Sequence, residues 1–300
     1  MSVLPATAAA AGTWRLGDLT VNRLGFGAMR LPQRGRALTA DSTPSDRSQS
    51  IAVLRRAVDL GVNHIDTADF YFSPLRSANE LINTALAPYP ADLVIVTKVG
   101  PRRDASGAWM PAARPDELRG QVELNLRQLG RDHLDVVNLR RMPTMGDSIA
   151  EHFGALADLR EAGLIRYLGT SGVTAEDLAA AQAIAPVVCV QNAYSLDRSA
   201  DPLLRLCGEQ GIAFVPFFAI AGASRHEGPA AEPAEVAAIA AAHGVTAAQV
   251  RLAWTLHQGS HVLAIPGTGS LEHLEQNVAA AALQLSASEL SRLAATAAAN

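Results

Sequence analysis

A chain of 300 residues is long enough for one large α/β domain or two small ones, with a sizeable hydrophobic core in either case. Its 49% hydrophobic and 18% charged residues exclude a disordered chain, and its net charge of −4 gives no support for a nucleic-acid or anionic-membrane partner. No apolar run is as long as a membrane span, and residues 1–12 lack the basic and apolar segments of a signal peptide, so we expect a cytoplasmic protein.

A β-hairpin is predicted near the N-terminus, followed by the first strand of a barrel. Gly17-Asp18 supply a tight turn between two short alternating segments within residues 14–21. The strand over residues 23–29 contains Gly25-x-Gly27, which lets another group approach the backbone closely. Residues 1–12, which precede the hairpin, are expected to form a flexible tail.

Beyond this strand, helices alternate with short apolar runs that are often β-branched. The further expected strands are 64–66, 93–98, 134–139, 165–170, 187–191, 212–217 and 261–265. The expected helices are 48–60, 75–86, 115–129, 148–162, 175–184, 202–210, 233–243, 247–257, 271–281 and a last one from Ser286. Continuous apolar strands are typical of a parallel sheet that is covered on both faces. Eight such strands in this length predict a closed (β/α)₈ TIM barrel.

A doubly wound parallel sheet is the alternative fold, but its phosphate-binding fingerprint is missing. Gly25-x-Gly27 has no third glycine at the required spacing, and Gly267-x-Gly269 follows the last strand, not the first. No change of composition marks a second domain. We therefore expect residues 13–300 to form a single α/β barrel domain.

Polar residues follow the second and third predicted strands, at the strand ends where a TIM barrel builds its active site. Asp66 ends one strand, Tyr71 lies five residues later on the next loop, and Lys98 ends the neighbouring strand. A buried carboxylate is expensive unless a cation or several donors satisfy it, and Lys98 would be that cation. The ammonium would also lower the pKa of Tyr71 from about 10 toward neutrality, as a general acid requires.

Each of these residues also has a simpler interpretation. Asp66 could be a turn or cap residue and Lys98 a solvent-exposed charge, but the three residues together favour a catalytic site. No metal site is expected, because two small residues interrupt the histidine pair His257 and His261 and no C-x-x-C pair occurs. A proton donor without a nucleophile or a metal implies that an organic cofactor brings the hydride.

Other strand ends carry candidates for substrate and cofactor contacts, namely Arg140, Ser171, Gln191 and Tyr194. Tyr194 could stack on a flat ring or be an aromatic residue at the rim. After the last strand, Thr268 and Ser270 precede a helix and His273 lies one turn inside it, an arrangement typical of an anion cradle. An ordinary helix cap at Ser270 is the alternative.

Together these motifs resemble the aldo-keto reductase family over nearly the whole chain, from about Trp14 to the final helix. The resemblance is carried by HIDTADFY, the lysine of IVTKVG, LDVVNLR, VQNAYSL and IPGTGSLEHLEQN. It implies a (β/α)₈ barrel closed at its base by the N-terminal hairpin, with NADP(H) bound in an extended form and no metal. It also implies that Tyr71 donates the proton while Lys98 and Asp66 tune it.

The resemblance further implies a set of residues around the cofactor. These residues are Gly27, Met29, Ser171, Gln191, Tyr194, Pro216, Phe217, Gly267, Thr268, Ser270, His273 and Asn277. The last five are expected at the 2′-phosphate and the adenine. Many family members carry an arginine for the 2′-phosphate at the position of His273, so the preference of this chain for NADP over NAD depends on a weaker cation.

The chain departs from the family at the end of the fourth strand. Where the family carries the histidine that completes its catalytic tetrad, in a pattern like QLHR, the sequence NLRR places Arg140, so the resemblance implies Arg140 as the fourth catalytic residue. LDVVNLR, with VCVQN and GIAFVPFF, resembles the bacterial branch of the family that reduces pyridoxal to pyridoxine. The resemblance therefore implies an NADPH-dependent carbonyl reductase that acts on a small-molecule aldehyde or ketone, with pyridoxal as the named substrate.

Two alternatives stay open at this point. The first is a cofactor-binding regulatory subunit with slow turnover, like the channel β-subunits of the same family, although the sequence shows no docking segment for a membrane partner. The second concerns Arg140, whose guanidinium could contact both the aldehyde oxygen and the adjacent phenolic oxygen of pyridoxal, or could turn away to pair with a carboxylate.

Overall fold

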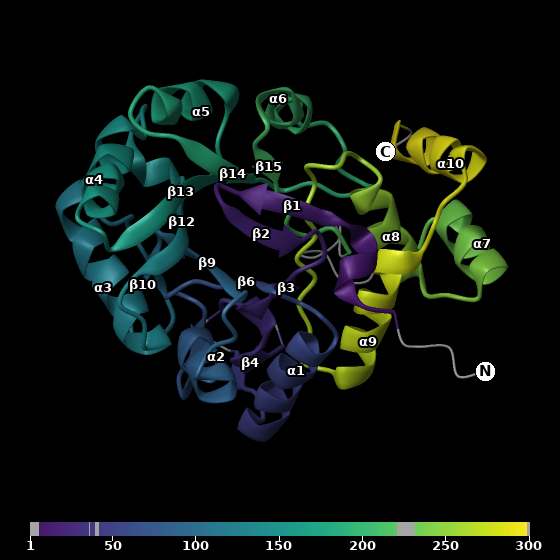
Figure 1. The fold of residues 1–300 in the computed structure, drawn as a ribbon, viewed down its shortest axis with the longest axis horizontal. Coiled ribbons are helices and arrows are strands. Elements are labelled where there is room, and N and C mark those ends of the chain that lie inside the picture. Colours follow the sequence, from purple (N-terminus) through teal and green to yellow (C-terminus); the bar gives the residue numbers. More distant parts are fainter. Residues whose placement is uncertain (1–5, 36, 40–41, 221–231, 299–300) are drawn as a thin grey trace.

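Parallel strands form a curved ring at the centre of the molecule, and helices surround it (Figure 1). The structure is a computed structural model that describes residues 6–35, 37–39, 42–220 and 232–298. Seven parallel strands are hydrogen-bonded in the order β15-β14-β13-β12-β9-β6-β3. Their bounds are β3 Phe26–Gly27, β6 His64–Asp66, β9 Val94–Val99, β12 Leu134–Arg140, β13 Ile165–Ser171, β14 Val187–Gln191 and β15 Ala213–Phe214. The fold is the (β/α)₈ TIM barrel that the sequence predicts.

Residues 262–264 close the ring between its first and last strands. Parallel bridges join Val262 to Phe214 in β15 and Ala264 to Leu24, two residues before the start of β3. The eighth predicted strand is therefore reduced to isolated bridges, yet it still completes the barrel.

Glycines allow the two ends of the ring to approach each other. A Cβ on Gly267 would lie 2.3 Å from the carbonyl oxygen of Gly27, and a Cβ on Gly27 would lie 2.7 Å from that of Ile265. No side chain fits between these backbones. The close approach expected at Gly25-x-Gly27 is thus made by the closing segment at Gly27 and by His64 at Gly25.

The helices between the strands cover the outside of the ring (Figure 1). They are α1 Arg47–Asp59, α2 Ala78–Leu86, α3 Leu118–Leu129, α4 Ala150–Glu161, α5 Ala175–Gln182, α6 Pro202–Gln210, α7 Ala234–His243, α8 Ala247–Leu256, α9 Leu271–Ala279 and α10 Ala287–Ala298. Leu54 of α1, Ile82 of α2 and Phe153 of α4 are fully buried in one core with Ile65 and Ile95 of the strands. Burial of this apolar surface is the main force that holds the helices on the ring.

The N-terminal hairpin closes the base of the barrel, as predicted. Its strands, β1 (Thr13–Leu16) and β2 (Leu19–Asn22), pair antiparallel and cross the ring in Figure 1. Leu16 and Val21 share a buried cluster with inward-facing strand residues such as Val94. The hairpin therefore covers this end of the barrel interior, opposite the C-terminal ends of the strands.

Part of the segment expected as a flexible tail, residues 1–12, has regular structure. Residues 1–5 lie outside the described residues, but Ala8–Ala11 form a 3-10 helix. Ala8 is fully buried, and its amide donates a hydrogen bond of 2.9 Å to the Leu60 carbonyl at the end of α1. The small alanine side chains allow this segment to pack closely against the barrel.

Three short hairpins follow the C-terminal ends of β3, β6 and β9, where the sequence predicts loops or the start of a helix. They are β4–β5 (Gln33–Arg34, Thr43–Pro44), β7–β8 (Phe72–Ser73, Arg76–Ser77) and β10–β11 (Arg102–Arg103, Trp109–Met110). The helix predicted from residue 75 accordingly begins at Ala78, because Pro74-Leu75 form the turn of the second hairpin. These hairpins surround the mouth of the barrel.

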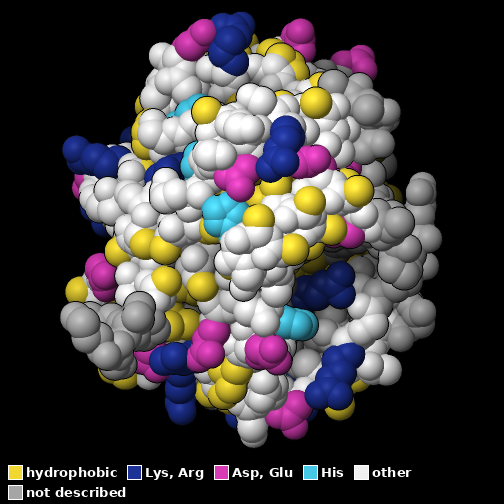
Figure 2. All heavy atoms as spheres, turned by 90° about the vertical axis from the view of Figure 1, so that its right-hand side faces the viewer, with side chains coloured by type: hydrophobic (Ala, Val, Ile, Leu, Met, Phe, Trp, Pro, Cys, Tyr) yellow, Lys and Arg dark blue, Asp and Glu magenta, His cyan; other side chains and the backbone are white. Residues whose placement is uncertain are grey.

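The outer surface carries mixed charge. On the face drawn in Figure 2, basic and acidic side chains are interspersed and the hydrophobic ones are scattered among them. In the described part of the chain, no single helix is long and apolar enough to cross a membrane, and α7 and α8 meet those criteria only together, across a 95° bend.

Candidate active site

A cavity of about 540 Å³ opens at the C-terminal ends of the strands, where the sequence predicts the active site. Most of its wall is apolar, and a few polar side chains converge on it. They are Thr39, Asp66, Tyr71, Lys98, Arg140, Ser171 and Gln191. The structure thus brings the four predicted catalytic residues together in one small-molecule-sized pocket.

Asp66 is held from two sides. Lys98 Nζ donates hydrogen bonds to Asp66 Oδ1 at 2.5 Å and to the Thr67 carbonyl at 3.1 Å. Gln191 Nε2 donates to the other carboxylate oxygen, Oδ2, at 2.6 Å. Both carboxylate oxygens therefore have hydrogen-bond donors, so neither is buried without a partner. The predicted pairing of Asp66 with Lys98 is therefore confirmed.

The same contacts keep Lys98 charged. Burial alone would lower the pKa of Lys98, but the carboxylate of Asp66 and the hydroxyl of Tyr71 together outweigh it and raise the pKa above its ordinary value. The site therefore contains a fixed ammonium group at neutral pH.

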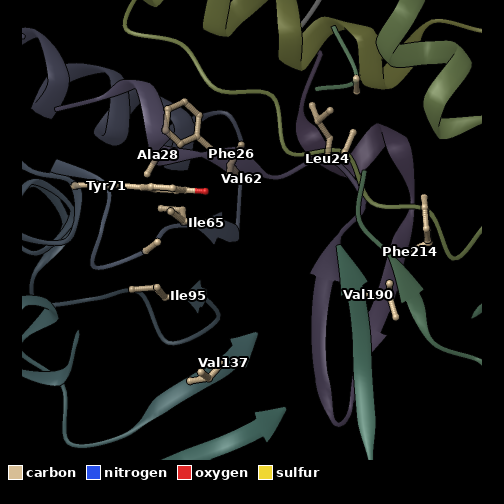
Figure 3. Close-up of a cluster of buried hydrophobic side chains, with 14 of the residues drawn as sticks. Leu24, Phe26, Ala28, Val62, Ile65, Tyr71, Ile95, Val137, Val190 and Phe214 are labelled. Atoms are coloured by element: carbon tan, nitrogen blue, oxygen red, sulfur yellow. The ribbon is translucent and has the colours of Figure 1, made fainter. Parts of the chain in front are cut away.

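Tyr71 lies in the cavity wall beside Ala28 and Ile65 (Figure 3). Lys98 Nζ is 5.0 Å from the centroid of its ring. Burial raises the pKa of Tyr71 above 10, and the ammonium of Lys98 offsets this only in part. The expected lowering of this pKa is therefore wrong, because the phenolate loses more hydration than the cation replaces. The phenol stays protonated across neutral pH, which is the form that a proton donor needs.

Arg140 points into the cavity. Its Nη1 donates to Ser171 Oγ at 3.1 Å, and its guanidinium lies 4.9 Å from the ring centroid of Phe217. No carboxylate of the described residues forms an ion pair with it, whereas the neighbouring Arg141 pairs with Asp177 at 3.0 Å. Of the two orientations left open by the sequence, the structure thus has the one that faces the cavity.

Six of the twelve residues expected at the cofactor line this cavity or a pocket of about 110 Å³ beside it. Those in the large cavity are Met29, Ser171, Gln191 and Phe217, and those in the small pocket are Pro216 and Gly267. Phe218 and Ile265 line both, so the two spaces are adjacent. Gly27 contacts Gly267 through the close backbone approach at the barrel closure.

Four further expected cofactor residues, Thr268, Ser270, His273 and Asn277, lie just before α9 or within it. Ser270 Oγ accepts a hydrogen bond from the His273 amide at 3.3 Å, and Thr268 Oγ1 accepts one from the Ser270 amide at 3.1 Å. His273 is exposed, whereas Asn277 is buried one turn further along. Ser270 is therefore the helix cap that the sequence offered as the alternative, at a helix N-terminus that remains suited to an anion.

Tyr194 does not line the cavity, which corrects its expected place at the cofactor. Its ring stacks on Trp254 with 5.6 Å between centroids and 10° between planes, and its hydroxyl donates to Gln258 Oε1 at 3.2 Å. The chain just after β14 pairs with Phe217, and this pairing turns Tyr194 toward α8. Phe217, with which this loop pairs, lines the cavity, and Tyr194 does not.

Sequence reasoning missed much of the apolar wall. The unpredicted residues that line the cavity are Ala37, Leu38, Thr39, Phe70, Pro101, Trp109, Met142, Phe218 and Ile265. A tryptophan in the polar loop after the third strand was a signal that could have identified Trp109. Leu38 and Phe218 adopt positive φ values of 63° and 71°. A sequence gives a signal for a positive φ at glycine, but not at leucine or phenylalanine.

Comparisons with known proteins agree with this geometry. A family model described as "Aldo/keto reductase family" matches residues 23–298. Pyridoxine 4-dehydrogenase of Escherichia coli is 44% identical over 94% of this chain and 96% of its own length. An uncharacterised oxidoreductase of Schizosaccharomyces pombe is 38% identical over 95% of this chain and 90% of its own length. The crystal structure of an aldo/keto reductase from Klebsiella pneumoniae in complex with NADP and acetate has a TM-score of 0.77 at 28% identity, over 95% and 94% of the two chains. The chain described here therefore belongs to the aldo/keto reductase family.

Proposed function

We propose that this chain is an NADP(H)-dependent carbonyl reductase that converts pyridoxal to pyridoxine, with Tyr71 as the proton donor. The observation that carries the proposal is the single cavity onto which Tyr71, Lys98 and Arg140 converge. The activity named for the Escherichia coli relative supports the substrate, and the NADP in the Klebsiella pneumoniae structure supports the cofactor.

The residues around the cavity fit a nicotinamide cofactor. Gln191 uses its Nε2 on Asp66, and its buried Oε1 has no partner among the described residues, so it can accept a hydrogen bond from a carboxamide. Phe217 offers a flat apolar ring, and the N-terminus of α9, with His273 in its first turn, suits a phosphate. When bound, NADPH supplies the hydride to the carbonyl carbon of the substrate.

The proton reaches the carbonyl oxygen of the substrate from the hydroxyl of Tyr71. Negative charge develops on that oxygen during reduction, and the fixed cations of Lys98 and Arg140 stabilise it. Asp66 and Gln191 hold Lys98 in place through the carboxylate, so this stabilisation requires no rearrangement during the reaction. Arg140 itself stays charged and cannot donate the proton, which leaves that role to Tyr71.

Arg140 favours an aldehyde that carries an adjacent oxygen. A guanidinium has five N–H donors in a fixed fork, and among the described residues Ser171 Oγ is the acceptor that Arg140 meets. The phenolic oxygen of pyridoxal lies next to its aldehyde, so one guanidinium can contact both oxygens. Such a contact would orient the carbonyl and neutralise the phenolate together.

The experiment that tests this function is the pyridoxal-dependent loss of NADPH absorbance with the purified protein, combined with chromatographic detection of pyridoxine. We expect turnover with pyridoxine as the product. Tight NADPH binding with negligible turnover on pyridoxal and on simple aldehydes would instead indicate the regulatory type of barrel.

A further inference from the structure

The β10–β11 hairpin carries the most exposed of the three tryptophans into the wall of the cavity. Trp109 lines the cavity, yet 48% of its surface is exposed. Trp254 is buried and Trp14 is half-buried. Leaving an indole in water forgoes a large hydrophobic gain, so an exposed tryptophan at the rim of a pocket indicates a contact that is made on binding.

The hairpin is fixed to the loop that carries the proposed proton donor. Arg103 Nη1 donates to the carbonyl of Phe70 at 3.1 Å and to that of Phe72 at 2.8 Å. The guanidinium of Arg103 also lies 4.5 Å from the ring centroid of Phe72 and 5.7 Å from that of Trp109. The hairpin is therefore held to this loop by hydrogen bonds of Arg103, and the indole packs against Arg103 and Phe70.

Three aromatic rings run from the hairpin to the reacting centre. Trp109 and Phe70 lie 6.0 Å apart between ring centroids, and Phe70 and Tyr71 lie 5.1 Å apart in an edge-to-face contact. The indole thus stands at one end of a packed row, and the phenol of Tyr71 stands at the other. All three rings line the cavity, so a substrate ring bound with its aldehyde oxygen at Tyr71 occupies the same space that the indole borders.

The other walls of the cavity are held in uncommon backbone conformations. Leu38 and Phe218 are the non-glycine residues with positive φ in the described part of the chain, and both line this cavity. Such conformations persist where the surrounding structure fixes them, and they cluster at ligand-binding sites. The backbone around Leu38 and Phe218 therefore fixes part of the cavity wall, and Trp109 is the exposed aromatic residue in that wall.

We propose that Trp109 is a specificity-determining residue that stacks on the flat ring of an aromatic aldehyde, so that the site selects aromatic over aliphatic carbonyl substrates. This inference rests on the proposed carbonyl-reductase function and adds a recognition element for the ring to the one that Arg140 provides for the oxygens. An electron-poor ring such as a pyridine complements the electron-rich face of an indole.

The test compares Trp109→Leu and Trp109→Phe with wild type, and Leu75→Ala serves as the matched control. Leu75 is another exposed large hydrophobic residue on a rim hairpin, but it lies outside the cavity. The ratio of kcat/KM for benzaldehyde to kcat/KM for propanal should fall roughly 3- to 10-fold in Trp109→Leu, mainly through KM, and Trp109→Phe should restore most of it. An unchanged ratio in Trp109→Leu would overturn the proposal.

A binding measurement decides the question without turnover. The enzyme with NADP⁺ is titrated with 4-deoxypyridoxine, a flat ring that has no oxidisable group at the reacting position. Stacking should quench the exposed tryptophan emission of wild type, and this quench should disappear in Trp109→Phe. Equal quenching in wild type and Trp109→Phe would refute the stacking. If wild type reduces no aldehyde, the proposed function is refuted, and this titration still tests whether Trp109 stacks on a flat ring.

Discussion

Arg140 stands at the position where the sequence resemblance implies a histidine in the family, and a guanidinium there gives the pocket a different chemistry. A neutral histidine donates one hydrogen bond, whereas arginine stays charged and donates several in a fork. Ser171 and the ring of Phe217 keep the guanidinium in the cavity. Gly172 provides the room, because a Cβ there would lie 2.7 Å from Arg140 Nη1.

The substitution Arg140→His tests this role by restoring the residue that is usual in the family. Loss of a charge-assisted contact to the phenolic oxygen should lower kcat/KM for pyridoxal by about 10-fold or more. Benzaldehyde has no such oxygen and should be reduced as well or better. Arg141→Lys is the control, since Arg141 pairs with Asp177. Equal responses of pyridoxal and benzaldehyde to Arg140→His would rule out the two-oxygen contact.

The barrel is closed by short backbone contacts between the segment after α8 and the first and last strands of the sheet. The segment around residues 262–264 joins the ring through bridges, not through a long ladder. Just beyond it, Gly267 packs against Gly27 at a distance that excludes any side chain. The stability of this edge therefore depends on glycine at position 267.

Gly267→Ala should destabilise the barrel, because its Cβ would lie 2.3 Å from the Gly27 carbonyl oxygen and the backbone would have to shift. We expect a loss of about 1–3 kcal/mol in the free energy of unfolding, measured by urea denaturation. Gly269→Ala is the matched control, since no atom lies within 4 Å of a Cβ at that position. A similar loss in both variants would contradict the packing account of closure.

The sequence was sufficient for the elements that follow from local patterns. The alternation of apolar strands and amphipathic helices predicted the barrel, and the polar strand ends predicted Asp66, Lys98 and the cavity around them. Features that depend on tertiary contacts were not predictable. The outward turn of Tyr194 follows from the pairing of its loop with Phe217, and the raised pKa of Tyr71 follows from burial that no local pattern shows. The rim hairpins were missed because their strands are only two residues long.

Over the whole molecule, two buried groups give the folding stability opposite dependences on pH. Burial lowers the pKa of His64 from 6.5 to about 4, so the unfolded chain takes up a proton first and stability falls as the pH drops from 6.5 toward 4. Burial raises the pKa of Asp69 from 3.8 to about 7, so the unfolded chain releases its proton first and stability falls as the pH rises over that range. The two effects oppose each other between pH 4 and 6.5.

Asp69→Asn separates the two effects. Asparagine resembles the neutral carboxyl of the folded state, and it removes the cost that Asp69 imposes as the pH rises. The stability of the variant relative to wild type should therefore increase by roughly 3–4 kcal/mol between pH 4 and pH 7. Urea denaturation at several pH values measures this, with Asp92→Asn as the control for loss of an exposed charge. A difference that does not change with pH would show that Asp69 ionises normally in the folded protein.

The measurement that tests the central claim most directly compares wild type and Tyr71→Phe for NADPH binding and for reduction of pyridoxal. The substitution keeps the ring that packs between Ala28 and Ile65 and removes only the hydroxyl. General acid catalysis contributes about 10²–10⁴-fold, so turnover should fall by that factor while the Kd for NADPH stays unchanged. Reduction of pyridoxal by Tyr71→Phe at a rate within a few-fold of wild type would contradict the assignment of Tyr71 as the proton donor.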